Sequence, residues 1–202
     1  YFQLLVYNLN TTQSTYLLKM SIKISYKTGS NEQYIKNYVL FSDDEFKING
    51  LSKLNINKNS NQISKTIISN KSKKKDFISF NLNPNQKIIL IKIKNKLTAT
   101  ENEKRGASFY NYLKSNLLFD VTFIDKNTTA TQSKNSTFFD EFLHGMQLKS
   151  YNFNKYKTKQ EVKNIEITIL NSKKIKNKKR FDRFSSILEG TNYTKDLVSE
   201  PG

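Results

Sequence analysis

The stretch QKIILIKIK, residues 86–94, decides the fold because four consecutive apolar residues, Ile88 to Ile91, lie at its centre. A strand with one face in water alternates apolar and polar residues, whereas an unbroken apolar run indicates burial on both faces. We therefore expect a sheet with helices over both of its faces. The preceding segment DFISFNL, residues 76–82, is predicted to be a second strand, connected through the turn residues Asn83-Pro84-Asn85.

Strand and helix patterns alternate on both sides of this stretch. The other segments with a strand pattern are 21–26, 37–44, 117–125 and 162–170. Helical spacing is found at Ile63, Ile67 and Ile68, over 98–115, from 136 and from Phe181 onward. The polar segment 126–137 is predicted to be a loop. This alternation predicts one α/β domain, a three-layer α/β/α arrangement with a mixed, mainly parallel sheet.

Three of the predicted helices carry specific signals. The helix over 98–115 starts with Thr98 and Glu101, the spacing of a capping box. The helix from 136 has an apolar face made of Phe138, Phe139, Phe142, Leu143 and Met146. The last helix has one stripe with Phe181, Phe184 and Leu188 and a neighbouring stripe with Ile187, Thr191, Thr194 and Val198. We expect the first stripe to cover the domain and the second to be exposed.

The charge of the chain permits two interpretations. The 202 residues carry a formal net charge of +17, which is typical of proteins that bind nucleic acid or anionic surfaces. Lysine supplies nearly all of this charge, since the only arginines are Arg105, Arg180 and Arg183. A nucleic-acid-binding protein is expected to use arginine for bidentate contacts. Compositional bias towards Lys, Asn, Ile, Tyr and Phe is therefore the favoured explanation.

The sequence predicts no catalytic, cofactor-binding or metal-binding residue. Its one histidine, His144, is expected to be structural, and its acidic residues form no metal-ligand pattern. The glycines are isolated, so no phosphate-binding loop is present, which also disfavours a stand-alone binder of ADP-ribose. Cysteine is absent and no apolar run approaches a membrane span, which together lead us to expect no disulfide, no membrane anchor and a cytoplasmic location.

Three motifs carry a family resemblance. The segment LEGTNYTKDLVSEPG, 188–202, closely resembles the junction between the two domains of M17 leucyl aminopeptidases, and FLHGMQLKSYNFNKYKTK, 142–159, resembles a second family segment. A third, weaker match lies in residues 95–115, where Arg105 corresponds. The other matching residues include Gly145, Tyr151, Phe153, Tyr156, Lys157, Glu189, Gly190, Asp196, Leu197 and Pro201. Lys195 departs from the family, which usually has arginine there.

The resemblance implies that the chain is the macro-like, non-catalytic N-terminal domain of an M17 aminopeptidase. Residues 1–19 would be a tag remnant or an upstream extension that need not be ordered, 20–180 the domain, and 181–202 the helix leading to a missing catalytic domain. That domain would hold two divalent metals, Zn or Mn, because the family's metal-binding and catalytic signatures do not occur here. The family also implies a hexamer in the cytoplasm and, in some members, DNA binding. A basic nucleic-acid-binding domain is the alternative function.

The aromatic residues of the second motif, Tyr151, Phe153 and Tyr156, are expected to pack the end of their helix against the sheet. A contact between domains is the alternative role for them.

Overall fold

The computed structural model describes residues 22–28, 35–70, 75–94, 97–132, 137–153, 164–170 and 178–200. Within them lies a sheet whose strands are β1 (Ile22–Lys27), β2 (Asn37–Ser42), β3 (Phe77–Asn83), β4 (Gln86–Lys92), β5 (Asp120–Ile124) and β6 (Ile165–Leu170). The helices are η2 (Leu51–Lys53), η3 (Asn55–Asn59), α2 (Ser60–Asn70), α3 (Ala99–Ser115), α4 (Asp125–Gln132), α5 (Phe138–Ser150) and α6 (Lys178–Ser199).

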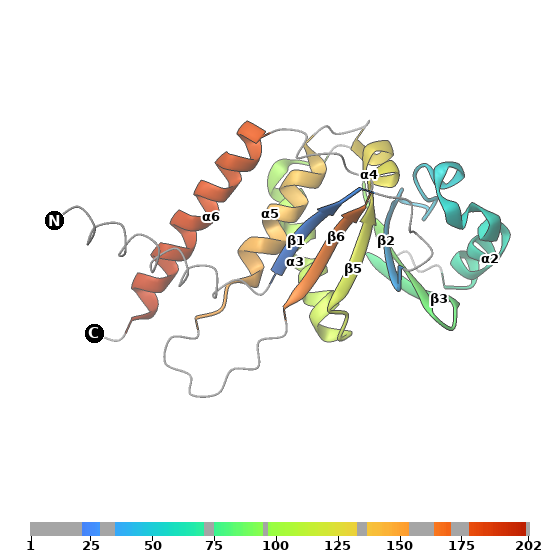
Figure 1. Cartoon of the computed structure of the whole chain (residues 1–202), viewed down its shortest axis with the longest axis horizontal. Helices are drawn as coiled ribbons and strands as arrows, with labels where there is room; N and C mark the ends of the chain where they lie inside the picture. Colours follow the sequence, from blue (N-terminus) through green and yellow to red (C-terminus); the bar gives the residue numbers. More distant parts are fainter. Residues whose placement is uncertain are drawn as a thin grey trace.

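The sheet is mixed and mainly parallel, as predicted. Its strand order is β1-β6-β5-β2-β4-β3, and every neighbouring pair is parallel except the hairpin β3–β4 (Figure 1). At the hairpin, the backbone N–H of Asn85 donates to Oδ1 of Asn83 at 2.9 Å, so the asparagine side chain closes the predicted turn.

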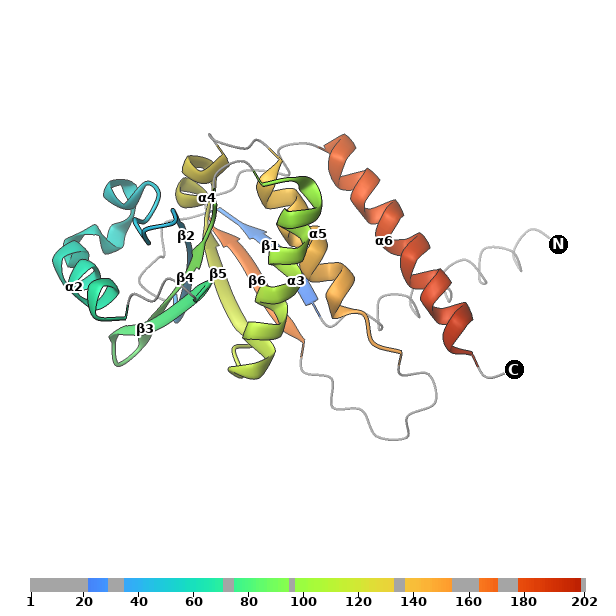
Figure 2. The same ribbon diagram turned by 180° about the vertical axis from the view of Figure 1, so that it is seen from behind.

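Helices lie on both faces of the sheet, which confirms the predicted layering. Helices α3 and α5 cover one face along its length, with α6 outside α5 (Figure 2). On the other face, η2, η3 and α2 pack over the half formed by β2, β4 and β3. The central run Ile88 to Ile91 is fully buried because it contributes to both cores.

The half of the sheet formed by β1, β6 and β5 differs on this second face. On this face Lys23, Ser25, Asp120, Glu166 and Thr168 are exposed or half-buried, whereas Thr122, Ile124 and Leu170, nearer the carboxyl ends of the strands, are buried. Their neighbours in sequence point into the α3–α5 core, so these strands show the alternation of a sheet covered on one side.

The capping box of α3 is confirmed. The backbone N–H of Glu101 donates to Oγ1 of Thr98 at 3.3 Å, and the backbone N–H of Thr98 donates to Oε2 of Glu101 at 2.8 Å. In α2, Ile63 and Ile67 are buried as helical spacing predicts, but Ile68 is exposed.

The loop predicted over 126–137 is wrong for residues 126–132, because Asp125–Gln132 form helix α4, and residues 133–136 lie outside the described residues. The segment is polar, but one of its polar residues, Asn127, is buried and holds the helix against β2. Oδ1 of Asn127 accepts the backbone N–H of Phe41 at 2.7 Å, and Nδ2 donates to the carbonyl oxygens of Phe41 at 3.0 Å and Asn49 at 2.6 Å. These hydrogen bonds satisfy the end of β2, so tertiary contacts outweigh a weak local helix preference.

Candidate interdomain face on the last helix

Helix α6 is the most peripheral of the described helices. It lies along the outer side of α5, away from the sheet (Figures 1 and 2). It begins at Lys178, three residues before the predicted start at Phe181. Phe184, Leu188, Asn192 and Asp196 follow one another at a spacing of four residues, which places them on one stripe facing α5.

The first half of this stripe contacts a buried histidine. The ring of His144, on α5, stacks on that of Phe184 with centroids 4.5 Å apart. Nδ1 of His144 lies 2.9 Å from Oε1 of Glu103 on α3, while Nε2 is buried without a hydrogen-bond partner. Residue His144 thus joins three helices, and it belongs to no group of three or more metal-ligating side chains among the described residues. Nearby, Arg180 pairs with Asp140 at 3.3 Å.

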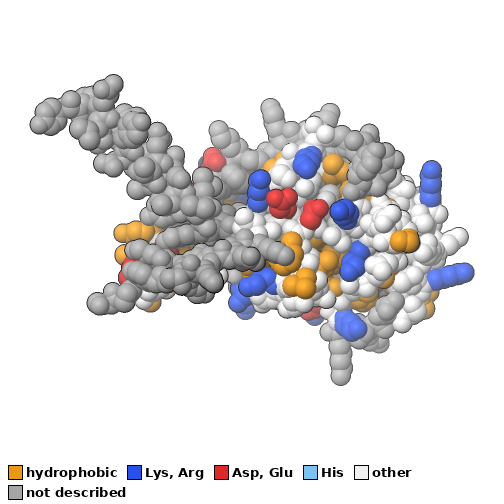
Figure 3. Space-filling model, turned by 60° about the horizontal axis from the view of Figure 1, so that its bottom comes forward, with side chains coloured by type: hydrophobic (Ala, Val, Ile, Leu, Met, Phe, Trp, Pro, Cys, Tyr) orange, Lys and Arg blue, Asp and Glu red, His pale blue; other side chains and the backbone are white. Residues whose placement is uncertain are grey.

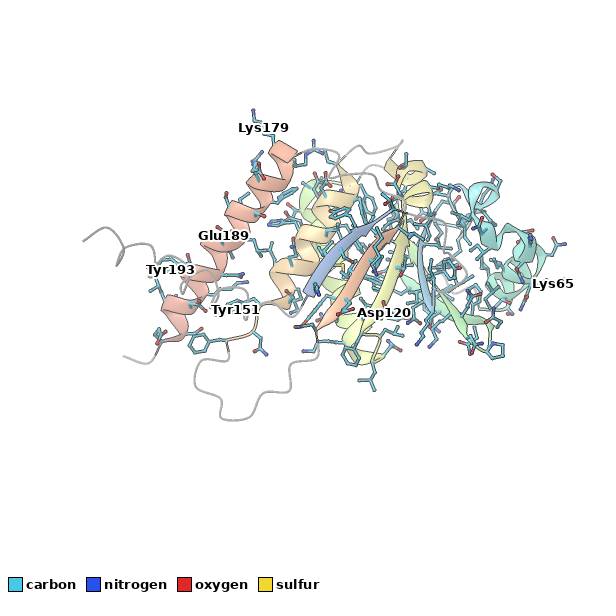
Figure 4. The ribbon with its side chains drawn as sticks, viewed as in Figure 1. Lys65, Asp120, Tyr151, Lys179, Glu189 and Tyr193 are labelled. Atoms are coloured by element: carbon cyan, nitrogen blue, oxygen red, sulfur yellow. The ribbon has the colours of Figure 1, made fainter. Side chains whose placement is uncertain are left out.

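The second half of the stripe is polar. The hydroxyl of Tyr151 donates to Oδ1 of Asp196 at 2.7 Å, and Nζ of Lys195 donates to the carbonyl oxygen of Leu148 at 3.2 Å while lying 5.0 Å from the centroid of the Tyr151 ring (Figure 4). Burial, with the hydrogen bond and charge of Asp196, raises the pKa of Tyr151 to about 12. Burial, followed by the charge of Lys149, lowers the pKa of Lys195.

The expected packing of Tyr151 against the sheet is therefore wrong. Tyr151 is the residue at which α5 ends, and its backbone angles are φ −56 and ψ 132. The chain leaves the helix in an extended conformation there, and the phenol contacts α6, where it donates a hydrogen bond to Asp196. Phe153 is half-buried, while Tyr156, Lys157 and Pro201 lie outside the described residues.

The stripe that faces α5 is called the inner stripe, and the opposite side of α6, with Ile187, Tyr193, Leu197 and Val198, is called the outer stripe. The outer stripe carries large exposed apolar side chains. The exposed fractions are 40% for Ile187, 52% for Tyr193, 57% for Leu197 and 81% for Val198, whereas Leu188 on the inner stripe is 4% exposed. The prediction of one stripe covering the domain and one exposed stripe is confirmed at Leu188, Ile187 and Val198. Glu189 is also exposed, and Figure 4 labels Glu189 and Tyr193 on this helix.

Two motif residues have structural surroundings that explain their type. A Cβ atom on Gly145 would lie 2.0 Å from the carbonyl oxygen of Glu103, so α5 and α3 meet at van der Waals distance there. Arg105 forms an ion pair with Asp76 at 2.7 Å, joining α3 to the start of β3. Sequence reasoning missed Gly106, whose Cβ would lie 1.9 Å from the carbonyl oxygen of Phe142. Its only signal was a glycine inside a helical pattern.

The described residues give little room for other kinds of site. No group of three or more metal-ligating side chains occurs among them. Ligands of open α/β sheets bind beyond the carboxyl ends of the strands. At the carboxyl end of β2, the side-chain amide of Asn127 on α4 occupies the place where such a ligand would bind. No helix in the part of the chain described here is long and apolar enough to cross a membrane.

The lysines do not gather into one patch on the face shown in Figure 3. The blue side chains are spread over that face, with acidic side chains between them. A nucleic-acid groove would concentrate positive charge along one path.

Comparisons with known proteins give the same assignment as the sequence motifs. No protein-family model matches the chain. The chain is 46% identical over 63 residues to a protein named "Probable cytosol aminopeptidase" from Phytoplasma australiense, and this match spans 30% of the chain but 13% of that protein. The resemblance to the N-terminal domain of M17 aminopeptidases is confirmed by this relative and by the fold.

Two solved structures resemble the fold. A tomato leucine aminopeptidase variant matches 89% of the chain with a TM-score of 0.62 at 16% identity, and the match spans 38% of the tomato chain. The macrodomain of Thermus aquaticus DarG matches 74% of the chain with a TM-score of 0.41 at 7% identity. The chain thus spans well under half of either aminopeptidase.

Proposed function

We propose that this chain is the non-catalytic assembly domain of a leucyl aminopeptidase, an enzyme that removes N-terminal residues from peptides. Residues 20–180 would form the domain and residues 181–202 the end of the helix that connects it to a catalytic domain. The observation that carries the proposal is α6, which matches the family junction motif and turns large apolar side chains away from its own domain.

An exposed apolar stripe on one helix is costly in water unless another surface covers it. The residues that hold α6 on α5 are found at both halves of the helix, at Phe184 and at Asp196. With its inner stripe held in this way, α6 presents its outer stripe as a fixed surface. We infer that this surface docks against the catalytic domain of the parent enzyme.

The metals of the parent enzyme do not fit the residues described here. The single histidine is engaged with Glu103 and Phe184, and the carboxylates among the described residues are dispersed. We therefore assign the two divalent ions, Zn or Mn, and the hydrolysis of the peptide bond to the catalytic domain. The present chain would contribute its docking surface and, with the rest of the enzyme, the assembly of a hexamer in the cytoplasm.

Hydrolysis of leucyl-amide substrates with added Mn²⁺ or Zn²⁺ tests this division of labour. We expect turnover by the parent polypeptide and none by the 202-residue chain. Metal-dependent turnover by the 202-residue chain alone would refute the assignment of catalysis to another domain. Absence of metal-dependent turnover by the parent polypeptide would refute the assignment of aminopeptidase activity to it.

A further inference from the structure

Three glycines lie inside described helices, and two of them have an evident structural role. Gly106 and Gly145 lie where the backbones of α3 and α5 approach each other too closely for a Cβ atom. Gly190, in the interior of α6, has no described atom beyond its own helix backbone within 4 Å of the position a Cβ would occupy. Glycine in a helix interior lowers helix stability relative to alanine, so packing among the described residues gives no reason for glycine here.

Gly190 lies at the middle of the outer stripe. Residues at i, i+3, i+4 and i+7 share one face of a helix, which places Ile187, Thr194 and Leu197 around Gly190. The hydroxyl of Thr194 donates to the carbonyl oxygen of Gly190 at 2.9 Å. That hydrogen bond satisfies the hydroxyl within α6. An apolar surface can therefore cover the outer stripe without leaving a buried donor unsatisfied.

We propose that Gly190 is the point at which a helix of the catalytic domain crosses α6 at close range, with Ile187, Leu197 and Val198 packing on either side of the crossing. This inference rests on the proposed function and adds the position and geometry of the contact. The distance between packed helices depends on the side chains at their crossing, and glycine permits the shortest distances. The α3–α5 crossing shows the same use of glycine within this fold.

The size of the stripe favours a tethered partner over a second copy of this chain. One face of a single helix offers on the order of a few hundred Å² of apolar area, whereas separate proteins need about 800 Å² on each partner for a stable interface. A domain connected through α6 itself has a high effective concentration and does not need so large a contact. The catalytic domain, which we propose to follow α6 in the chain, meets this condition.

Cysteine labelling in the parent polypeptide tests the inference, because the present chain contains no cysteine. The reporters are Thr194→Cys and Leu197→Cys on the outer stripe, with Ile68→Cys on α2 as an exposed control. Labelling is read peptide by peptide with mass spectrometry, in the parent polypeptide and in the 202-residue chain. We expect both reporters to be labelled about tenfold more slowly in the parent polypeptide, which corresponds to about 1.4 kcal/mol, and the control to be unchanged.

The role of the glycine itself is tested by adding Gly190→Leu. It should restore fast labelling of both reporters in the parent polypeptide, because its side chain would block the crossing helix. Glu189→Leu is the matched control, since this neighbouring exposed position lies about 100° further round the helix. It should leave the protection in place. Both variants should leave the 202-residue chain folded, because each position is exposed.

The other outcomes separate this inference from the proposed function. Protection that survives Gly190→Leu would overturn the close crossing but leave the assembly role intact. Fast labelling of the reporters in a parent polypeptide that hydrolyses leucyl-amides would overturn the docking surface. Protection in the 202-residue chain that grows with its concentration would identify a second copy as the occupant and overturn the tethered partner. A parent polypeptide without aminopeptidase activity would remove the proposed function, and with it this inference.

Discussion

Helix α5 packs against both α3 and α6, and the contacts with these two helices are built differently. Against α3 it packs mainly through apolar side chains and through Gly145, where the two backbones touch, with hydrogen bonds from Asn102 to Glu141 and between Glu103 and His144 beside them. Against α6 it uses one aromatic stack and a set of hydrogen bonds, and the apolar side chains of α6 mostly point the other way. The first contact can form only at one spacing. The second holds a helix in place while leaving its apolar face for another surface.

The comparison teaches how glycine and burial should be interpreted in this molecule. A glycine at a closed contact is required by the fold, whereas a glycine on an open face of α6 is one that we propose to serve a contact outside the described residues. In the same way, Leu188 serves its own domain and Leu197, on the same helix, does not.

Substitution of Gly145 by alanine should have the largest effect. The added Cβ would meet the carbonyl oxygen of Glu103 at 2.0 Å, and the obstacle is backbone that cannot rotate away. We expect a loss of about 3 kcal/mol in the free energy of unfolding, measured by urea denaturation, because the helices must separate and leave voids. A wild-type denaturation midpoint would mean that α3 and α5 are not in contact at this point.

Substitution of Leu188 by alanine should loosen α6 while leaving the α3–α5 contact intact. The side chain is 4% exposed, so its loss should cost about 2 kcal/mol, seen as faster amide exchange in α6. Leu197→Ala is the matched control, because this leucine is 57% exposed and should change stability by about 0.5 kcal/mol or less. Equal effects of the two substitutions would contradict the assignment of inner and outer stripes.

Alkaline pH should release the second half of α6. The folded chain favours the neutral phenol of Tyr151, so its contribution is complete below the ordinary pKa of 10.0 and is lost as the pH rises towards about 12. Tyr151→Phe removes the hydrogen bond to Asp196 and should cost about 1 kcal/mol at neutral pH.

The Tyr151→Phe variant also separates the titration of the Tyr151 phenol from that of the many lysines, because the lysines titrate in both proteins. We expect the difference in stability between wild type and Tyr151→Phe to shrink as the pH rises from 10.0 towards about 12, measured by urea denaturation at each pH. A difference that stays constant over this interval would show that the phenol does not titrate with α6.

Much of the fold follows from local sequence patterns. The unbroken apolar run Ile88 to Ile91 indicates a strand that is covered on both faces. The alternation of polar and apolar residues in SIKISY, 21–26, is typical of a strand that is covered on one face. The two stripes of α6 were also legible, because helical spacing alone separates Leu188 from Ile187. These features depend on neighbours in sequence, which pattern analysis can use.

The features that sequence analysis missed depend on partners far away in the chain. Asn127 turns a polar segment into helix α4 by bonding to Phe41, 86 positions earlier. Tyr151 was assigned to the sheet because its acceptor, Asp196, lies on a helix 45 positions later. Gly106 looked like a weakness in a helix until Phe142 was seen beside it. None of these partners could be identified from local periodicity.

The smallest expected effect is a gain in stability, whereas the other substitutions lower it. It tests the comparison between the α3 and α6 contacts most directly. Gly190→Ala should stabilise the 202-residue chain by about 0.5 to 1 kcal/mol, because the new methyl group meets no atom of another described element within 4 Å and alanine is the better helix former. The same substitution at Gly145 destabilises, so one chemical change gives opposite results on two helices of one domain. Urea denaturation of both variants beside the wild type measures this. A loss of stability in Gly190→Ala would mean that something within the chain already packs on the outer stripe, and the glycine would then serve the domain itself.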